Sequence, residues 1–340
     1  MKILSPGKIR ALQTASTKNG IFNILAIDHR DSLRIVIDPD HPEVVSAASL
    51  TTLKLAIIEQ IAPHTTAVML EPEYSAAQAI VAGALPGHVG FLSALEEQGY
   101  LGNPYARQTT LLNGWSVAQA KRLGASGIKL LIFYHPDAEE AAERQETLVK
   151  AVVADCAREE IPLFLEPLAY PLDPAVPVHS AEFAAQRRRI VVETARRLGA
   201  LGPDILKMQF PLDAKYDSDE GLWRDACAEL NEAAPVPWAL LSGGDPYDSF
   251  KVQVRVACQS GCSGFMAGRA LWREAIGAAE TERTTILRNT VLPRFEELSH
   301  IANTHGQGWQ IRYTLPVVDE AWFRGYEPPI ASDNEAVMTN

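Results

Sequence analysis

A single lysine interrupts an otherwise apolar segment in the second half of the chain. Lys207 stands in the run Asp204-Ile-Leu-Lys-Met-Gln-Phe-Pro-Leu212, which otherwise reads as a buried strand. Burying an ammonium group is costly, because apolar neighbours cannot replace its hydration. A lysine that is kept neutral near pH 7 is a nucleophile, and its usual target is a carbonyl carbon. Lys207 is therefore a candidate Schiff-base residue.

Other charged residues lie in, or directly after, further apolar segments. Only 21% of the residues are charged, so their concentration in the most apolar parts of the chain points to a role. If these segments are parallel strands of a barrel, the residues at their carboxyl ends meet at one mouth, where barrel enzymes carry their active sites. The residues in question are Asp28, His29, Arg30, Glu71, Glu73, Lys129 and Glu166.

Lys129 and Lys207 are most informative as a pair. If Lys129 faces the barrel interior, it approaches Lys207 from two strands away. A second ammonium group and desolvation would each lower the pKa of Lys207, while Asp28 and Glu166 would balance the remaining charge and could move protons. The alternative is that both lysines pair with these carboxylates in a buried ion network that serves structure alone.

Two glycine turns predict a phosphate site. Ser242-Gly243-Gly244 ends one apolar segment and Gly268-Arg269 ends the next, and each opens a helical stretch. Glycine allows the backbone to approach an anion closely, and arginine offers a bidentate fork. Arg30, beside Asp28, is a candidate contact for a second anionic group at the far end of a longer substrate.

The elements that must position these residues alternate between strands and helices. Continuous apolar runs are typical of strands covered on both faces, and amphipathic stretches such as 138–159, 180–198, 220–234 and 249–259 separate them. Eight such units favour a (β/α)8 TIM barrel over an open doubly wound sheet. The run at 89–96 also fits the start of a helix. The predicted strands are 23–30, 67–74, 89–96, 127–134, 162–170, 204–211, 237–244 and 263–271.

We expect residues 1–306 to form one barrel domain. In this interpretation residues 1–22 are a helix and a turn that plug the bottom of the barrel, and residues 273–302 are one or two helices after the last strand. Residues 307–340 are a C-terminal tail, for which a lid, an oligomer contact and disorder remain open.

Composition and charge exclude several classes of function. The formal net charge of −11 argues against nucleic acid and anionic membranes as partners. No zinc-ligand spacing or nucleotide-binding glycine loop is present, so we expect neither a metal nor a cofactor. The four cysteines show no paired spacing, and the N-terminus lacks an apolar signal region. We therefore expect a cytoplasmic protein with reduced thiols, and a homo-oligomer.

The order of the motifs resembles that of the class I tagatose 1,6-bisphosphate aldolase family, over residues 20–305. Two motifs depart from the family pattern: Asp28-His29-Arg30 replaces Asp-Gln-Arg, and Glu71-Pro-Glu-Tyr74 replaces Asp-Pro-Glu-Tyr. The motifs that carry the resemblance are Ala26-Ile-Asp-His-Arg30, Met69-Leu-Glu-Pro-Glu-Tyr74, Gly127-Ile-Lys-Leu-Leu131, Pro162-Leu-Phe-Leu-Glu166, Asp204-Ile-Leu-Lys207, Leu240-Leu-Ser-Gly-Gly244 and Ala267-Gly-Arg269.

The resemblance implies a role for each matching residue. Lys207 would form the Schiff base, Glu166 would transfer protons, and Asp28 and Lys129 would complete the polar centre. The positions that would surround the phosphate of dihydroxyacetone phosphate are Ser242, Gly268 and Arg269.

The reaction implied is cleavage of a ketose phosphate, foremost tagatose 1,6-bisphosphate, to dihydroxyacetone phosphate and glyceraldehyde 3-phosphate. The segment 263–272 is also similar to the sulfofructose-phosphate aldolases, so a distal sulfonate stays open. Two rival interpretations are a metal-dependent barrel lyase or isomerase that uses Asp28, Glu71, Glu73 and Glu166 as ligands, and a barrel that binds sugar phosphates for regulation without turnover.

Overall fold

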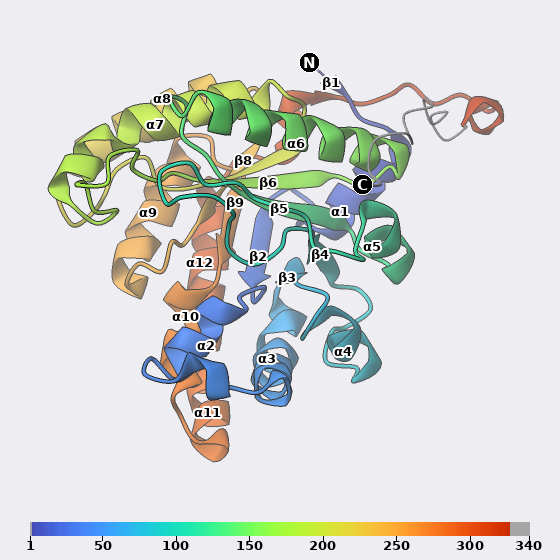
Figure 1. The fold of residues 1–340 in the computed structure, drawn as a ribbon. Coiled ribbons are helices and arrows are strands. Elements are labelled where there is room, and N and C mark those ends of the chain that lie inside the picture. Colours follow the sequence, from blue (N-terminus) through green and yellow to red (C-terminus); the bar gives the residue numbers. More distant parts are fainter. Residues whose placement is uncertain (1, 327–340) are drawn as a thin grey trace.

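Eight short parallel strands form a closed barrel at the centre of the molecule, and helices surround it (Figure 1). The computed structural model describes residues 2–326. Each barrel strand pairs with the next one in the chain, and the last pairs with the first. The predicted (β/α)8 barrel is confirmed, including the strand near residue 90 that the sequence left open. The strands are β2 (Phe22–Ala26), β3 (Ala67–Leu70), β4 (Gly90–Ala94), β5 (Gly127–Phe133), β6 (Leu163–Leu168), β7 (Ile205–Met208), β8 (Trp238–Leu241) and β9 (Gly264–Ala267).

Burial on both faces explains why the strands read as continuous apolar runs. Every residue of β3, β7, β8 and β9 is buried, and parallel pairing satisfies the backbone polar groups. Three of the strands nevertheless carry a charged residue: Lys129 in β5, Glu166 in β6 and Lys207 in β7. Such side chains need polar partners within the barrel.

The covering helices each bury one face against the barrel. In α6 the buried positions recur every three or four residues, as Gln145, Val149, Val152 and Cys156 do. Ser180 caps α7 by accepting a hydrogen bond from the backbone N–H of Phe183. The helices between the strands are α2 (Asp31–Ile37), α3 (Ala47–Ile61), α4 (Ala76–Val81), α5 (Val117–Leu123), α6 (Glu140–Arg158), α7 (Ala181–Gly199), α8 (Glu220–Ala233) and α9 (Tyr247–Gln259).

The chain after β9 turns into helices earlier than predicted. The strand predicted over 263–271 is too long, because Gly268 ends the strand and Arg269 already begins α10; the apolar sequence continues into that helix, which buries Leu271 and Trp272. None of the helices within residues 2–326 is both long and apolar enough to cross a membrane. The last segments are α10 (Arg269–Ile276), α11 (Glu280–Ile286), a π-helical turn (Leu287–Val291) and α12 (Leu292–His305).

The N-terminal segment and the segment around Trp309 and Tyr313 close the base of the barrel. Leu4 and Leu12 from the N-terminal segment and Trp309 and Tyr313 from the C-terminal segment pack against inward-facing side chains of the strands. The predicted N-terminal plug is therefore confirmed. The plug consists of β1 (Lys2–Ile3) and α1 (Pro6–Thr14). The C-terminal strand β10 (Tyr313–Thr314) pairs with β1.

Asp204, at the start of the β7 segment, ties these pieces together. Its carboxylate accepts hydrogen bonds from Lys2 Nζ at 3.0 Å, Lys8 Nζ at 2.7 Å and the backbone N–H of Leu163 at 2.9 Å. Its backbone carbonyl accepts a hydrogen bond from the hydroxyl of Tyr313. One buried carboxylate thus joins the N-terminal plug, the barrel and the C-terminal segment.

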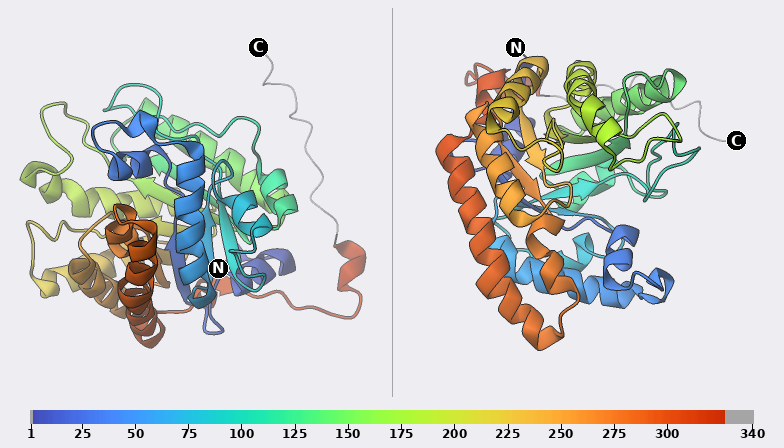
Figure 2. Two further views of the ribbon diagram at one scale, coloured as in Figure 1. Left: turned by 90° about the horizontal axis from the view of Figure 1, so that it is seen from below. Right: turned by 90° about the vertical axis from the view of Figure 1, so that its left-hand side faces the viewer.

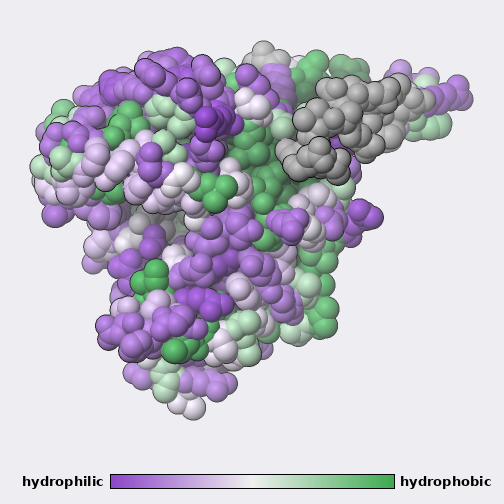
Figure 3. All heavy atoms as spheres, in the orientation of Figure 1, coloured by the Kyte–Doolittle hydropathy of each residue, from purple (hydrophilic) through white to green (hydrophobic). Residues whose placement is uncertain are grey.

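The rest of the expected C-terminal tail leaves the base. Residues 315–326 protrude from the body of the molecule (Figures 1 and 2) and expose apolar side chains, among them Val317 and Phe323. The outer surface over α7 and α8, by contrast, is mostly hydrophilic (Figure 3). Residues 327–340 lie outside the described residues, so the role of the tail stays a prediction.

Candidate active site

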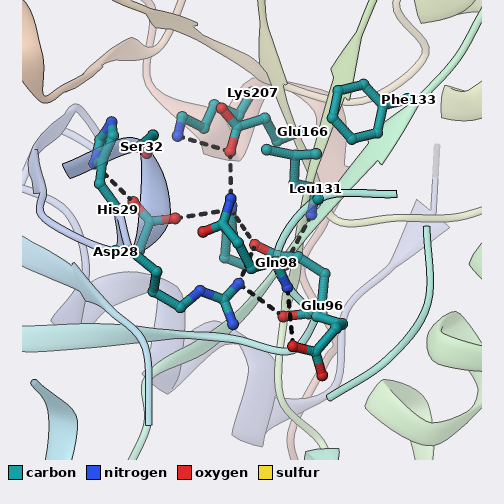
Figure 4. Close-up of a pocket in the computed structure, with 13 residues that line it drawn as sticks. Asp28, His29, Ser32, Glu96, Gln98, Leu131, Phe133, Glu166 and Lys207 are labelled. Carbon is teal, nitrogen blue, oxygen red and sulfur yellow. Dashed lines mark hydrogen bonds and ion pairs between the residues drawn. The ribbon is translucent and has the colours of Figure 1, made fainter. Parts of the chain in front are cut away.

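A cavity opens at the carboxyl ends of the barrel strands, and charged side chains from several strands line it (Figure 4). The predicted strand-end residues Asp28, His29, Arg30, Lys129, Glu166 and Lys207 all reach it. Asp28 to Arg30 lie just beyond the carboxyl end of β2, because that strand ends at Ala26. The remaining lining residues are Ser32, Glu96, Glu97, Gln98, Gly99, Leu131 and Phe133.

Lys207 is only 4% exposed, and its ammonium group has few polar neighbours. Nζ lies 2.9 Å from Glu166 Oε2 and 3.4 Å from the sulfur of Met69, which is a weak acceptor. Figure 4 shows the side chains of Lys207 and Glu166 directed toward each other. Among the described residues, Glu166 is the one carboxylate within ion-pair distance of Lys207 Nζ.

Lys129 is surrounded by three carboxylates. Its Nζ lies 2.8 Å from Asp28 Oδ2 and 3.3 Å from Glu166 Oε2, and it donates a short hydrogen bond to Glu96 Oε1. Burial would lower the pKa of Lys129, but these carboxylates more than offset the effect and raise the pKa above its ordinary value. Lys129 is thus held as an ammonium ion, and Glu166 Oε2 lies within ion-pair distance of both Lys129 and Lys207.

Asp28 is the carboxylate most strongly held in its ionised form. Burial would raise the pKa of Asp28, but the ammonium groups of Lys129 and Lys207 outweigh that effect. The pKa of Asp28 consequently lies well below its ordinary value. Asp28 is therefore a fixed negative charge at neutral pH, and it is better suited to orient Lys129 than to donate a proton.

Glu96 is part of the site, although the sequence reasoning did not select it. It lies just beyond β4, and its second oxygen accepts a hydrogen bond from the backbone N–H of Leu131 at 3.0 Å. The signal was available, because Glu96 follows the third strand as Asp28 follows the first. It could be used only once the segment before it was known to be a strand.

His29 lies between the charged centre and the glycine turns. Its ring packs edge-on against Trp272, with centroids 5.1 Å apart. Burial lowers the pKa of His29 to about 3; Asp28 opposes the shift, whereas Arg269 and Lys207 add to it. The ring is therefore neutral, and its Nδ1 has no hydrogen-bond partner among the described residues. Nδ1 is itself buried and lies 3.7 Å from Asp28 Oδ1, so the ring lines the cavity through its other atoms.

Arg30 is engaged by protein groups. One guanidinium nitrogen donates to Glu73 Oε2 at 2.8 Å and another to the backbone carbonyl of Glu96 at 2.9 Å. Burial would lower the pKa of Arg30, but Glu96 and Glu73 raise it overall. Arg30, which the sequence suggested as a contact for the far end of the substrate, thus lines the cavity, but Glu73 and Glu96 already balance its charge.

The carboxylates of the metal-dependent rival do not converge. Glu71 is fully buried and forms an ion pair with Lys54 at 2.5 Å, while Glu73 faces Arg30. Asp28 and Glu166 both contact Lys129, which occupies the space between them. The four side chains therefore do not form one ligand set.

The two glycine turns predicted to bind phosphate face each other at the mouth. The backbone N–H of Gly268 donates to Ser242 Oγ at 3.3 Å, and Arg269 Nη2 donates to the carbonyl of Gly243 at 3.4 Å. Gly243 and Gly244 have φ of +57° and +89°, a region that side-chain-bearing residues rarely adopt. The structure thus brings all five predicted residues together.

A second arginine, which the sequence reasoning did not select, adjoins this turn. Arg273 Nη2 donates to the carbonyl of Gly244 at 3.1 Å, and a Cβ atom at Gly244 would lie 3.3 Å from the guanidinium carbon of Arg269. Burial lowers the pKa of Arg269, and the nearby charge of Arg273 lowers it further. Two guanidinium groups beside glycine N–H groups suit an anion such as phosphate.

Together the fold and site define a class of enzyme. A closed (β/α)8 barrel with a buried lysine, a carboxylate linking it to a second lysine, and an anion-binding turn at the same mouth has what Schiff-base cleavage of a carbon–carbon bond requires. The chain belongs to the DeoC/LacD family of aldolases, whose family model matches residues 22–274.

Known proteins resemble the chain in sequence or in fold. The chain is 28% identical to tagatose 1,6-diphosphate aldolase 2 of Streptococcus agalactiae serotype III (strain NEM316), over 91% of this chain and 99% of that protein. A Schiff-base-forming fructose-1,6-bisphosphate aldolase has a similar fold, with a TM-score of 0.55 and 17% identity over 87% of this chain and 99% of the other. The fructose-bisphosphate aldolase of Plasmodium falciparum gives a TM-score of 0.64 and 16% identity, over 91% and 98%.

Proposed function

We propose that this aldolase cleaves a ketose 1,6-bisphosphate, foremost D-tagatose 1,6-bisphosphate, to dihydroxyacetone phosphate and D-glyceraldehyde 3-phosphate. The observation that carries the assignment of roles is the difference between the two buried lysines. Three carboxylates hold Lys129 as a cation, whereas Glu166 is the one carboxylate of the described residues within ion-pair distance of Lys207, and Lys129 shares it. Glu166 can therefore take a proton from Lys207, which leaves Lys207 as a neutral amine that acts as the nucleophile.

The first half of the reaction forms the Schiff base. Neutral Lys207 Nζ attacks the ketone carbon C2, and the carbonyl oxygen takes up a proton to give a carbinolamine. The distance of 2.9 Å between Glu166 and Nζ supports Glu166 as the group that transfers these protons. Loss of the protonated hydroxyl as water leaves an iminium ion between C2 and Lys207.

The second half breaks the C3–C4 bond. A base removes the proton of the C4 hydroxyl, its electrons form the aldehyde carbonyl, and the electron pair of the C3–C4 bond moves into the iminium to give an enamine. The aldehyde then leaves. Protonation of the enamine at C3 and hydrolysis of the new iminium release dihydroxyacetone phosphate and regenerate Lys207. Glu166 is our candidate for the proton transfers, and Asp28 assists through Lys129.

The remaining residues hold the substrate. Lys129 stays cationic and donates a hydrogen bond to a substrate hydroxyl or developing oxyanion in the buried cavity. The glycine turns and Arg269 are proposed to bind the C1 phosphate, which sets C2 beside Lys207. Neutral His29, whose ring lines the cavity, is proposed to contact the same end of the substrate.

A substrate panel tests the function. Purified protein is incubated with the 1,6-bisphosphates of tagatose and fructose, and with 6-deoxy-6-sulfofructose 1-phosphate, and triose phosphate release is followed with a coupled enzyme. We expect the highest kcat/KM on tagatose 1,6-bisphosphate. Tight binding of all three without triose phosphate release would instead support a regulatory binding protein.

We further propose that the enzyme is a cytoplasmic homo-oligomer. The exposed apolar side chains Val317, Trp322 and Phe323 on the protruding residues 315–326 support a contact with a second copy. Light scattering coupled to size exclusion should show an oligomer for the full chain, and a smaller species when the chain is truncated after Thr314. A full-length monomer would refute the proposal.

A further inference from the structure

A loop between β4 and α5 folds over one side of the cavity as a hairpin. The backbone N–H groups of Leu101 and Gln108 donate to each other's carbonyls at 2.8 and 2.9 Å, and Glu97 N–H donates to Thr110 O at 2.8 Å. The descending arm starts at Glu96 and includes Gly99, and both of these residues line the cavity. The hairpin is thus an ordered part of the cavity wall.

Arg107, on the returning arm of this hairpin, lies among three aromatic rings. Its guanidinium carbon is 4.7 Å from the ring centre of Tyr100, 5.2 Å from that of Phe133 and 5.1 Å from that of Tyr170. Stacking fixes the plane of the guanidinium group and leaves its N–H edges free for hydrogen bonds.

Few protein groups use those edges. Nε donates to the carbonyl of Pro104 at 2.8 Å, and no carboxylate within residues 2–326 forms an ion pair with Arg107. Arg30, the distal contact that the sequence suggested, differs in this respect, because Glu73 and Glu96 already balance its charge. Arg107 is thus a cation beside this part of the cavity that has no carboxylate partner in the part of the chain that the structure describes.

The position of Arg107 matches the outer end of the cavity. Lys129, Leu131 and Phe133 alternate along β5 and line one wall, and at about 3.3 Å per residue Phe133 lies roughly 13 Å along the strand from Lys129. Phe133 is labelled at the edge of the site in Figure 4. Arg107 covers this ring and therefore lies near the rim, away from the reacting centre.

The barrel places Arg107 opposite the phosphate turns. In the closed order β2 to β9, the hairpin and its aromatic support belong to β4, β5 and β6, whereas the glycine turns follow β8 and the last strand, β9. Strands β4 and β8 are four places apart in an eight-stranded ring, which is half of its circumference. A substrate whose C1 phosphate occupies the glycine turns would thus extend across Lys207 toward the side of Arg107.

From this geometry we propose that Arg107 binds the tetrahedral oxyanion at the far end of the substrate, and thereby selects ketose phosphates with an anionic C6 group. A phosphate and a sulfonate share the required chemistry. The proposal rests on the proposed function, since it takes the C1 phosphate to bind at the glycine turns. Arg107 would be a specificity residue and would take no part in bond cleavage.

The test compares Arg107→Gln and Arg107→Lys on three substrates: tagatose 1,6-bisphosphate, tagatose 1-phosphate, and 6-deoxy-6-sulfofructose 1-phosphate. A charge-assisted hydrogen bond is lost, so we expect Arg107→Gln to lower kcat/KM on the two substrates with a distal anion by roughly 10- to 100-fold, mainly through KM. On tagatose 1-phosphate the value should stay within about threefold of wild type. A loss confined to the phosphate or to the sulfonate identifies which anion the site accepts.

Arg107→Lys separates charge from hairpin stability. Both variants lose the stacked guanidinium plane, but lysine keeps a cation. The kcat/KM of Arg107→Lys should therefore exceed that of Arg107→Gln on tagatose 1,6-bisphosphate, and the two values should be equal on tagatose 1-phosphate. Equal losses on all substrates, or no loss on any, would overturn the proposal. Arg144→Gln, an exposed arginine on α6, is the matched control and should behave as wild type.

Failure of the proposed function gives a different result. If wild type releases triose phosphate from none of the three substrates, the assignment of the reaction is wrong. Calorimetric binding of tagatose 1,6-bisphosphate to wild type and Arg107→Gln then decides the Arg107 proposal alone. Weaker binding to the variant supports it, and equal binding overturns it.

Discussion

Replacing Lys129 by methionine is the perturbation whose outcome the charge arrangement of the site defines most closely. The substitution keeps the volume and removes the cation that three buried carboxylates share, with Asp28 at 2.8 Å and Glu166 at 3.3 Å. Removing one partner of a buried ion pair costs about 3–5 kcal/mol, because the remaining charge is left without compensation. We expect a loss in this range at pH 8, measured by urea unfolding.

The loss should depend on pH in a defined direction. In the wild type the lowered pKa of Asp28 means that its ionised form stabilises the fold above its unfolded pKa of about 3.9, and that this contribution is lost as the pH falls through the folded value. The variant lacks the ammonium group that supplies most of this contribution. The difference in unfolding free energy between wild type and variant should therefore be largest near neutrality and shrink below about pH 5.

Lys54→Met is the matched control, since Lys54 and Glu71 form a fully buried ion pair outside the cavity. Glu71 keeps hydrogen bonds from Ser75 Oγ and the backbone N–H of Tyr74, both at 2.8 Å. We expect Lys54→Met to lose stability while its kcat stays within about threefold of wild type, because Lys54 does not line the cavity and its ammonium group pairs with Glu71. Lys129→Met should lose at least about 100-fold in kcat, the range of a catalytic proton-transfer or charge-stabilising group. Unchanged stability, or equal effects of both variants on kcat, would refute this account of the site.

Three further predictions concern single residues. Glu166→Gln should lower kcat by roughly 10²- to 10⁴-fold, the contribution of a general acid–base group, in steady-state assays; wild-type turnover would remove Glu166 from the mechanism. Because the pKa of His29 is lowered to about 3, the unfolded chain binds a proton that the folded chain does not between about pH 6.5 and 3, so stability should fall with falling pH by up to about 1.4 kcal/mol per unit. His29→Gln should flatten this dependence in urea unfolding, and an unchanged slope would contradict the assignment. Asp204→Asn should cost about 3–5 kcal/mol in the same assay by leaving Lys8 unpaired at the base, with kcat unchanged; a kcat loss without a stability loss would contradict the structural role of Asp204.

The order of the strands was predictable because each carries a buried apolar run. The ends of the strands were less predictable, because apolar sequence continues past the last hydrogen bond between the strands. Residues 27–30 were assigned to the first strand, yet β2 ends at Ala26 and leaves Asp28 to Arg30 in the mouth. Residues 269–271 were assigned to the last strand, yet they form the first turn of α10.

The site shows a similar division. The lysines and Glu166 could be found from the sequence, because a charge in a buried strand is conspicuous. The pairing of charged side chains could not be found from the sequence, because it depends on which strand ends meet in space. Arg30 reads as a free cation in the sequence, but Glu73 and Glu96 take up its hydrogen bonds. Arg107 gave no signal, since its aromatic neighbours come from three separate segments.

The central claim is that Lys207, and not Lys129, forms the covalent bond to substrate. Borohydride added during turnover with tagatose 1,6-bisphosphate reduces a Schiff base to a stable amine, and mass spectrometry of the digested protein locates it. We expect the adduct on the peptide that carries Lys207, retained in Arg144→Gln and absent in Lys207→Ala. An adduct on Lys129, or turnover with no adduct at all, would contradict the claim.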